Sequence, residues 1–359
     1  MVTAIIVNYF SAEITARAAL SIIADAPTAQ VFVVDNSNDL HEEQRLSTLL
    51  PPSVEYIVTD ENLGFGSACN MAFSQAKHEW IFLLNPDAYV LSGCIAAMVA
   101  FLESNPKAAA VAPRVFWDAE QNWLLPPAQL PTPANELFMT MGMHWPRLGK
   151  YLSNRFRRWA LCCNLSTTPT AQQMLSGGNM MLRRSAVEAV GGLFDPDFFM
   201  YYEDADLCYR FKKAGFSLYL LSKAHAVHEW CSSSHKEHLS HPSRQRYFNK
   251  HFKGHQLRCW QIKLEQSKLP QHLPFSSDLG ECCIPFDYSI PDDMQQQWLL
   301  ELSPHPLFVP ALYHYGNGDK CRISDHLWQR LGPGQYWARL SSSSTKSDQY
   351  FHWEIKHTR

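Results

Sequence analysis

The sequence predicts an α/β fold with a mostly parallel sheet, followed by a small β-rich domain. In the first 115 of the 359 residues, short apolar runs rich in Val and Ile alternate with Ala-rich stretches of helical spacing. This alternation is typical of a parallel sheet that helices cover on both faces. Beyond residue 266, short strand-like runs are separated by Gly, Pro and Ser turns instead. The chain is long enough to bury two hydrophobic cores, which agrees with two domains.

The elements of the first domain follow one another in a regular order. Five runs have strand character: Thr3–Val7, Val31–Val34, Val54–Val58, Trp80–Leu84 and Ala109–Ala112. Three stretches have helical spacing: Glu13–Ala24, Ser67–Ala76 and Leu91–Glu103. A further helix is expected to begin at Glu203, and another to cover Ser243–Lys263. Ligands of such sheets bind beyond the carboxyl ends of the strands, so the residues after each strand are candidates for a site.

The last part of the chain predicts a linker and a small β-sandwich-like domain. Residues 267–294 are rich in Pro, Ser and Asp, and are expected to form the linker. Residues 295–359 contain four strand candidates: Gln297–Leu302, Leu307–Tyr315, Gln335–Leu340 and Tyr350–Lys356. In the last of them apolar and polar residues alternate, as in a strand with one buried face. The tryptophans of this domain are expected to form its core, although they could instead bind sugar rings.

The composition excludes several classes of protein. Apolar residues make up 46% of the chain and charged residues 18%, which indicates a packed globular protein. Lys and Arg number 31 against 34 Asp and Glu, and the resulting net charge of −3 excludes a globally basic nucleic-acid binder. No apolar run approaches the ~18 residues that span a bilayer. The first residues carry no Lys or Arg before Arg17, so they predict a strand rather than a secretory signal.

The cysteines indicate a reducing compartment. Ten occur, two pairs of them are adjacent in sequence, and there is no CxxC motif. A scattered set of this kind suits free thiols that serve as small apolar side chains. We therefore expect a cytoplasmic protein.

Polar residues follow four of the predicted strands. They are Asn8 and Tyr9 after the first strand, Asp35, Asn36 and Ser37 after the second, residues 60–66 after the third, and Asn85, Pro86 and Asp87 after the fourth. A single Asp at a strand end is usually a turn or a helix cap, but four polar ends at one edge favour a shared site. Gly64 and Gly66 allow close approach of the backbone, and the helix after them offers free N–H groups to an anion. This loop matches neither a P-loop nor the G-x-G-x-x-G turn of a dehydrogenase.

The order of these motifs resembles that of a known family. The segments VNYF, VVDNSN, NLGFGSACN and LLNPDAYV are followed by SGGN at Ser176–Asn179, VGGLFD at Val190–Asp195, FMYYEDADLCYR at Phe199–Arg210 and a late His228. Together they resemble the family 2 glycosyltransferases with the GT-A fold. Within that family the chain is most similar to the rhamnosyltransferase-like members, which often carry Asn-Pro-Asp where other members have Asp-x-Asp. The resemblance covers about residues 1–255. It implies a domain over residues 1–266, with a nucleotide-binding half (1–115) and an acceptor half with a closing helix (116–266).

The resemblance implies an inverting glycosyltransferase. Such an enzyme moves a sugar from a nucleotide diphosphate donor, here a dTDP-rhamnose-like or UDP-sugar, to a hydroxyl of a glycan or lipid-linked acceptor. It implies Asp204 as the general base, with Glu203 as its positioning partner. It also implies Mg²⁺ or Mn²⁺ on the diphosphate, held by Asp87 with His228 nearby, although His228 could equally be an ordinary loop histidine. Asn85 replaces the first Asp of the family's motif, so the site offers the metal one charge fewer.

Two further sets of residues are implied in substrate binding. The donor side comprises Asn8, Tyr9, Asp35, Asn36, Asn62, Gly64, Phe65, Gly66, Asn70 and Asn85. The acceptor side comprises Gly177, Gly178, Asn179 and Asp206. By the same resemblance, Asp35 would accept hydrogen bonds from a pyrimidine ring and Tyr9 would lie beside that base.

Other functions stay open on the sequence alone. Carboxylates at positions 203, 204 and 206 would also stabilise the dipole of a helix that begins there. A sugar nucleotidyltransferase would share the fold, but it needs a Gly-rich signature followed by a Lys, and this chain has no Lys before Lys77. A non-catalytic carbohydrate-binding protein would use the C-terminal domain as its working part.

A basic segment without acidic residues lies between Glu136 and Glu188. Its cations are Arg147, Lys150, Arg155, Arg157, Arg158, Arg183 and Arg184, and aromatic residues are interleaved with them. This pattern suits an anionic partner. We expect it to face a lipid-linked diphosphate acceptor, with peripheral contact to the inner face of an anionic cell membrane and no nucleic-acid partner. A solvated helix face is the alternative.

Overall fold

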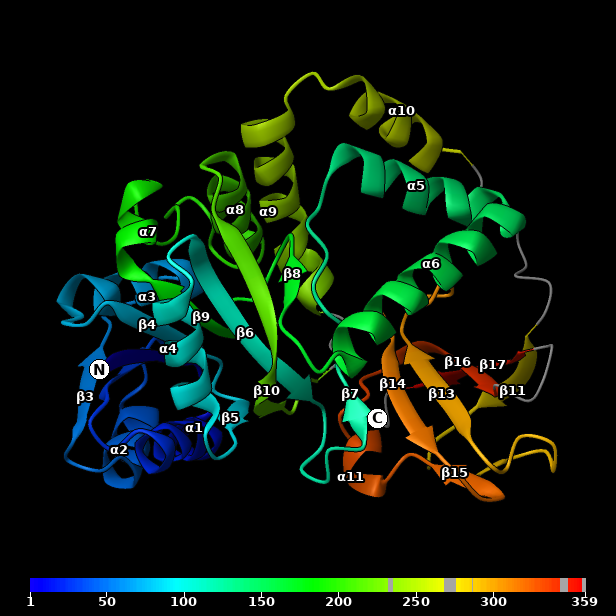
Figure 1. The fold of residues 1–359 in the computed structure, drawn as a ribbon, viewed down its shortest axis with the longest axis horizontal. Helices are drawn as coiled ribbons and strands as arrows, with labels where there is room; N and C mark the ends of the chain where they lie inside the picture. Colours follow the sequence, from blue (N-terminus) through cyan, green and yellow to red (C-terminus); the bar gives the residue numbers. More distant parts are fainter. Residues whose placement is uncertain (232–234, 268–275, 286, 343–347, 357–359) are drawn as a thin grey trace.

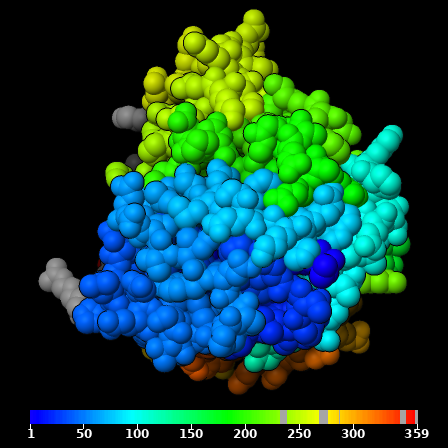
Figure 2. Space-filling model, turned by 90° about the vertical axis from the view of Figure 1, so that its left-hand side faces the viewer, coloured from blue at the N-terminus to red at the C-terminus, as the bar shows by residue number. Residues whose placement is uncertain are grey.

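The computed structural model describes residues 1–231, 235–267, 276–285, 287–342 and 348–356. In Figure 1 an α/β body lies beside a β-rich C-terminal part, and helices α5, α6 and α10 lie above the latter. Figure 2 views the α/β body from its own side, where the first part of the chain covers most of the face. Among the described residues, no helix is both long and apolar enough to cross a membrane.

The structure contains the following elements. The strands are β1 (Val2–Asn8), β2 (Gln30–Asp35), β3 (Val54–Val58), β4 (Trp80–Leu84), β5 (Ala88–Val90), β6 (Ala108–Phe116), β7 (Trp123–Leu124), β8 (Thr170–Gln172), β9 (Asn179–Arg183), β10 (Ser217–His228), β11 (Ser277–Glu281), β12 (Asp287–Ser289), β13 (Trp298–Ser303), β14 (Leu312–Gly316), β15 (Lys320–Arg322), β16 (Gly334–Ser342) and β17 (Gln349–Ile355). The helices are α1 (Ala12–Asp25), α2 (Leu40–Leu49), α3 (Phe65–Gln75), α4 (Cys94–Ser104), α5 (Pro133–His144), α6 (Pro146–Leu165), α7 (Arg184–Ala189), α8 (Glu203–Lys213), α9 (His235–Phe252), α10 (Gln256–Glu265) and α11 (Asp325–Trp328).

The predicted parallel sheet forms the core of the α/β body. Strands β3, β2, β1 and β4 are neighbours in that order and run parallel. Antiparallel β9 lies between β4 and β6, and β10 runs parallel to β6. The predicted α/β fold is therefore confirmed, with a parallel first half and mainly antiparallel pairing afterwards.

The sheet is covered on both faces because its central strand is apolar on both sides. Every residue of β1 is buried. Val2, Ala4 and Ile6 belong to the core cluster that includes α1 and α4, whereas Ile5 and Val7 belong to the cluster that includes α3 and α8. Successive side chains of a strand point to opposite faces, so one strand serves both clusters. The three helices predicted between the strands are present as α1, α3 and α4.

Two helical regions differ from the sequence expectation. Helix α2 was not predicted from its polar sequence; Asp39 caps it by accepting a hydrogen bond from the Glu42 N–H, and Leu46 is its buried contact. The helix predicted over Ser243–Lys263 consists instead of α9 and α10, because the chain turns at Gly254, where φ is +72°. Helix α8 begins at Glu203, as predicted.

One sheet runs through both parts of the chain. The short strand β7 joins them, since Leu124 lies opposite Phe116 of β6 on one side and Tyr313 of β14 on the other. Beyond β14 the order is β13, β16, β17 and β11. The smaller sheet of β12 and β15 shares one core with these strands, and three of the four tryptophans of the C-terminal part (Trp298, Trp328 and Trp353) are buried in that core, while Trp337 is partly buried against a neighbouring cluster. These three residues therefore serve packing, as expected.

The predicted linker contributes to the C-terminal part. Its described residues include β11, which pairs with β17, and β12, which pairs with β15. The remaining residues from 268 to 275, and residue 286, lie outside the described ranges. The division of the chain into domains stays a prediction.

Buried charges fix α6 to the C-terminal sheet. Glu301 on β13 is fully buried, and its carboxylate accepts hydrogen bonds from Arg339 Nε at 2.5 Å and Nη2 at 2.6 Å. Arg157 of α6 contacts the same carboxylate at 3.1 Å. Arg339 also donates to Ser153 Oγ of α6 at 3.0 Å. Since a buried charge is costly unless paired, this network holds the helix in one position on the sheet.

Candidate active site

The ends of the first two strands are joined by a buried polar group. Asn8, the last residue of β1, donates from Nδ2 to Asp35 Oδ1 at 3.0 Å and to Glu42 Oε1 at 3.1 Å. The other Asp35 oxygen accepts a hydrogen bond from the Tyr56 hydroxyl at 2.8 Å. Asp35 is only 1% exposed, so these internal contacts fix its carboxylate at the carboxyl edge of the sheet.

The glycine loop before α3 is held by two asparagines and one tight contact. Asn36 Nδ2 donates to Asn62 Oδ1 at 2.8 Å, and Asn62 Oδ1 also accepts from the Gly64 N–H at 3.0 Å. Gly64 has φ +79°, and a Cβ there would lie 2.1 Å from the Phe199 carbonyl oxygen. That same oxygen accepts from the Phe65 N–H at 3.0 Å. Only glycine fits position 64. The contacts with Phe199 hold the loop against the segment before α8.

Three other predicted donor residues differ in their surroundings. Asn70 Nδ2 donates to the Phe194 carbonyl at 2.8 Å, and the Phe194 N–H donates to Asn70 Oδ1 at 3.0 Å. Asn70 therefore supports the site from within the protein. Gly66 packs beside the same residue, because a Cβ at this position would lie 3.3 Å from Phe194 Cβ. Tyr9 is 54% exposed at the end of β1 and is available to a ligand.

Asp87 and His228 form the centre of a second polar group. His228 Nε2 lies 3.0 Å from Asp87 Oδ1, and His228 Nδ1 lies 3.2 Å from Asn179 Nδ2. If Nδ1 accepts from the amide, the proton resides on Nε2 and is donated to Asp87. The Asn85 N–H donates to the Gly178 carbonyl at 2.8 Å, and a Cβ on Gly178 would lie 2.5 Å from Asn85 Nδ2. Glycine at position 178 is thus required for this contact.

The carboxylate pair follows a strained turn. Tyr201 and Tyr202 have φ values of +69° and +67°, a conformation that residues with side chains rarely adopt. Helix α8 begins immediately afterwards with Glu203. The Gly177 N–H donates to Asp204 Oδ2 at 3.1 Å, and the N–H that follows Asp204 donates to its Oδ1 at 2.7 Å. The turn therefore places the Asp204 carboxyl against the Gly177–Asn179 segment.

The two carboxyl groups of the pair have different surroundings. Glu203 is 6% exposed, and burial, together with the neighbouring Asp204 charge, raises the pKa of Glu203 to about 8. Burial also raises the pKa of Asp204, but the Gly177 N–H opposes that rise by hydrogen bonding to the charged form. The Gly177 N–H thus favours the charged form of Asp204, whereas the contacts of Glu203 favour its protonated form.

Asp206 lies apart from the other predicted acceptor residues. It is fully buried and contacts Arg210 Nε at 2.8 Å, Lys250 Nζ at 2.7 Å and His251 Nε2 at 2.7 Å. Burial alone would raise the pKa of Asp206, but these partners outweigh it and lower the pKa to about 2. Its place on the acceptor side stays a prediction, and its contacts instead tie α8 to α9.

Part of the basic segment is engaged inside the protein. Arg183 donates to the backbone carbonyls of Leu102 and Ala108, and Arg184 donates to that of Phe73. Arg157 is paired with the buried Glu301. These three cations serve the fold, so an anionic partner would meet the other four.

The residues near Asp87 fit a metal that arrives with its substrate. Among the described residues, no group of three or more His, Cys, Asp or Glu side chains is placed to hold a metal ion. Asp87 and His228 would therefore offer two ligands at most. Mg²⁺ is commonly held by one or two carboxylates and completed by substrate phosphates, rather than by an all-protein cage. The donor set fits Mg²⁺ or Mn²⁺ on a diphosphate, and not a closed metal centre.

Sequence reasoning missed one residue beside this group. Glu229 pairs with Arg17 at 2.6 Å and with Arg330 of the C-terminal part at 2.9 Å, and its N–H donates to the Asp87 carbonyl at 2.8 Å. Its position directly after His228 was the only signal. The C-terminal part thus helps to hold the segment that carries His228.

Comparison with known proteins assigns the family. The model of glycosyl transferase family 2 matches residues 3–191, more than half of the chain, and that of glycosyl transferase family group 2 matches residues 137–273. The chain therefore belongs to glycosyl transferase family 2. It is a glycosyltransferase of the rhamnosyltransferase-like kind, as its motifs indicated.

Two curated relatives carry more specific names. The chain is 28% identical over 236 residues to the N-acetylglucosaminyl-diphospho-decaprenol L-rhamnosyltransferase of Mycobacterium tuberculosis, a match that covers 62% of this chain and 74% of the relative. It is 24% identical over 269 residues to the rhamnosyltransferase WbbL of Escherichia coli, a match that covers 71% of this chain and 89% of the relative.

A solved structure is similar in fold. A mannosyltransferase from Pyrobaculum calidifontis, solved with GDP-Man and Mn²⁺, superposes with a TM-score of 0.45 at 16% identity, covering 75% of this chain and 65% of that one.

The raised pKa of Glu203 predicts a specific pH dependence of stability. The fold favours the protonated form, so stability is full below the unfolded pKa of ~4.3 and falls as the pH rises towards 8. Glu203→Gln removes this loss. Above pH 8 the variant should be more stable than the parent by on the order of 2–4 kcal/mol, since one pKa unit corresponds to 1.36 kcal/mol.

Thermal melting of both proteins from pH 4 to pH 9 measures this difference. Glu13→Gln is the matched control, because Glu13 is an exposed carboxylate in the first turn of α1. Its melting curve should follow the parent at every pH. Parallel curves for the Glu203 variant and the parent would contradict the protonated state of Glu203.

Proposed function

We propose that the protein is an inverting glycosyltransferase that uses a nucleotide diphosphate sugar, dTDP-rhamnose-like or a UDP-sugar. The acceptor is a hydroxyl of a glycan or of a lipid-linked sugar. The curated names of the mycobacterial and E. coli relatives support rhamnose as the sugar and, for the former, a lipid diphosphate as the acceptor's carrier. The family assignment supports the reaction class.

One observation carries the proposal. Three consecutive residues contact the three groups that the reaction needs: Gly177 bonds to Asp204, Gly178 to the backbone of Asn85, and Asn179 to His228, which in turn contacts Asp87. The Asp204 carboxyl therefore borders the same short segment as the Asp87–His228 pair that suits a diphosphate. This is the arrangement that displacement at a sugar carbon requires, with a base on one side and the leaving group on the other.

The reaction then proceeds in one displacement. Asp204 accepts the proton of the acceptor hydroxyl as that oxygen forms its bond to the anomeric carbon. The bond from this carbon to the diphosphate breaks, and its electron pair stays on the diphosphate oxygen. The Gly177 N–H donates to Asp204 and favours the charged form, which is the form that can accept the proton. A divalent metal bound with the donor would neutralise the diphosphate, and Asp87 and His228 are the residues that would hold it.

Replacing the general base should remove turnover and spare donor binding. Asp204→Asn keeps the shape of the side chain but cannot take the proton, so kcat should fall by on the order of 10²–10⁴. Donor affinity should change little, because a base acts only in the transition state. Turnover with a sugar nucleotide and calorimetric binding of the same donor measure the two effects.

Asp206→Asn is the matched control on the same helix. It removes one charge from a buried cluster, so its melting temperature should fall clearly, while turnover per folded molecule should fall much less than in the Asp204 variant. If Asp204→Asn retains most of its turnover and only melts earlier, the two carboxylates serve the helix dipole and the catalytic assignment is wrong.

We also propose that α6 contacts an anionic membrane. After Pro146 at its start, its exposed positions form one stripe along the helix: Arg147, Lys150, Tyr151, Arg155, Arg158, Cys162 and Leu165. Trp145, at the corner before the helix, is 50% exposed, and Tyr151 is 55% exposed. A basic face with exposed aromatic residues suits the headgroup region of an anionic leaflet.

Neutralising this face should weaken vesicle binding. Gln at positions 147, 150, 155 and 158 should lower co-sedimentation with phosphatidylglycerol vesicles at least tenfold at low salt, since each cation near such a surface contributes about 1 kcal/mol. Arg157 is kept, because it pairs with buried Glu301. The control carries Gln at Arg45, Lys77, Lys107 and Lys223, which are exposed on the α/β body. If the parent and the α6 variant bind the vesicles equally, the exposed face of α6 is a solvated helix face and the membrane proposal is wrong.

A further inference from the structure

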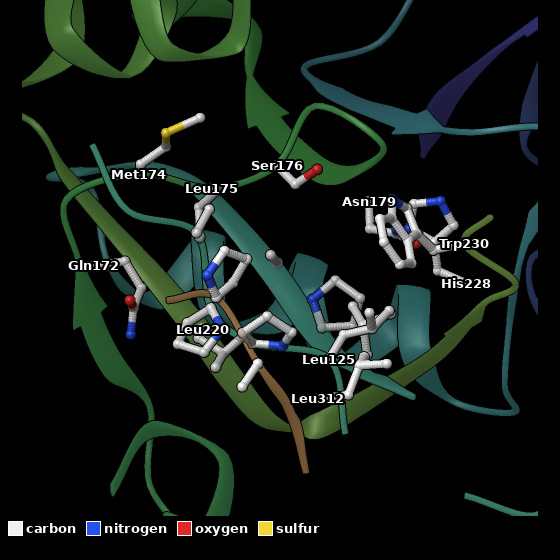
Figure 3. A pocket seen from close by; sticks show the side chains of 18 of the residues that line it. Leu125, Gln172, Met174, Leu175, Ser176, Asn179, Leu220, His228, Trp230 and Leu312 are labelled. Carbon is white, nitrogen blue, oxygen red and sulfur yellow. The ribbon is translucent and has the colours of Figure 1, made fainter. Parts of the chain in front are cut away.

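A cavity of about 280 Å³ lies between the α/β body and the C-terminal strands. Strands β6, β8 and β10 contribute to one side of it, and Leu302, Ala311, Leu312 and Tyr336 of the C-terminal part contribute to the other. Its volume is close to ~300 Å³, the lower end of the range for pockets that bind small molecules. Figure 3 gives a close view of the side chains that line it.

The cavity adjoins the candidate active site. Ser176, Asn179 and His228 belong to its lining. Ser176 precedes Gly177, whose N–H holds Asp204, and His228 contacts Asp87. A molecule in this cavity would therefore contact both ends of the Ser176–Asn179 segment, whose Gly177 N–H holds Asp204, although Asp204 itself does not line the cavity.

Two side-chain oxygens in the lining have no hydrogen-bond partner within the described structure. They are Gln172 Oε1 and Asn179 Oδ1, and their residues are only 9% and 2% exposed. The nitrogen of each amide is engaged: Gln172 Nε2 donates to Thr170 Oγ1 at 3.0 Å, and Asn179 Nδ2 lies 3.2 Å from His228 Nδ1. Figure 3 places Gln172 and Asn179 at opposite ends of the cavity. Buried carbonyl oxygens without donors are costly, so a ligand with hydroxyl donors at two ends would satisfy both.

The rest of the lining limits the chemistry of that ligand. Alanine, proline and leucine side chains dominate it, and none of the residues that line it is Lys, Arg, Asp or Glu. A phosphate or a uronic acid would find no Lys or Arg there, and the one histidine in the lining, His228, is already paired with Asp87. A hydrocarbon chain would leave both amide oxygens without donors. A neutral sugar ring meets both conditions, because its C–H face is apolar and its hydroxyls lie at the edge.

We infer that this cavity binds one neutral sugar ring of the acceptor, and that the C-terminal strands form one wall of the acceptor site. The inference rests on the proposed function, since it places the acceptor at the segment that holds Asp204. It gives the C-terminal part a role in acceptor choice. A charged sugar, or the lipid of a lipid-linked acceptor, lies outside this cavity.

Direct binding of simple glycosides tests the inference without turnover. Saturation-transfer NMR on the full chain would use methyl N-acetylglucosaminide and methyl rhamnoside as neutral probes, methyl glucuronide as the charged probe and octanol as the hydrocarbon probe. The neutral glycosides should bind, and neither of the other probes should displace them. Gln172→Met keeps the size of the side chain but removes the oxygen, so it should weaken neutral-glycoside binding about tenfold.

Two further variants make the test decisive. Gln173→Met is the matched control, because Gln173 is the exposed neighbour of Gln172 and does not line the cavity; it should bind as the parent does. Ala311→Leu fills the cavity from the C-terminal wall and should weaken binding at least tenfold, with melting curves confirming that the variant is folded. Displacement by octanol, or unchanged binding in both the Gln172 and Ala311 variants, overturns the inference. Failure of the proposed function is seen separately, as the absence of sugar-nucleotide binding by the parent protein.

Discussion

The close approach of the Gly177–Asn179 segment to its neighbours is the constraint on which the site depends. A Cβ on Gly178 would lie 2.5 Å from Asn85 Nδ2, so the Asn85 side chain keeps its position over this segment because residue 178 has no side chain. The adjoining residues then reach Asp204 on one side and His228 on the other. The proposed general base Asp204 and the Asp87–His228 pair proposed for the diphosphate are thereby positioned by one short segment.

A second constraint, the buried contacts of Asp206, holds α8 and therefore Asp204 in place. Asp206 is buried among Arg210, Lys250 and His251, and Arg210 also donates to the carbonyls of residues 190, 192 and 193. These bonds tie the first turn of α8 to α9 and to the loop that Asn70 holds against α3. A buried charge with three partners is costly to move, so these contacts hold α8 and the strained turn at Tyr202 in place.

The sequence predicted what depends on local pattern. Runs such as Trp80–Leu84 are apolar on both faces and can only be central strands, and the polar residues after them must then share one edge. It did not predict contacts between distant segments, because no periodicity encodes them. The pairing of β7 with β14, the partners of Asp206 and the link from Glu229 to Arg330 are of this kind. Charge counting likewise grouped Arg157 with surface cations, although its partner Glu301 lies far along the chain.

The central claim is that this site binds a sugar nucleotide through a metal-assisted diphosphate contact at Asp87. Calorimetric titration of the parent chain and of Asp87→Ala with UDP- and dTDP-sugars, each with and without Mn²⁺, tests it most directly. The account predicts donor binding that Mn²⁺ strengthens in the parent, and no Mn²⁺-dependent gain in the variant, while both melt alike. Equal donor affinity in the parent and in Asp87→Ala with Mn²⁺ present would contradict it.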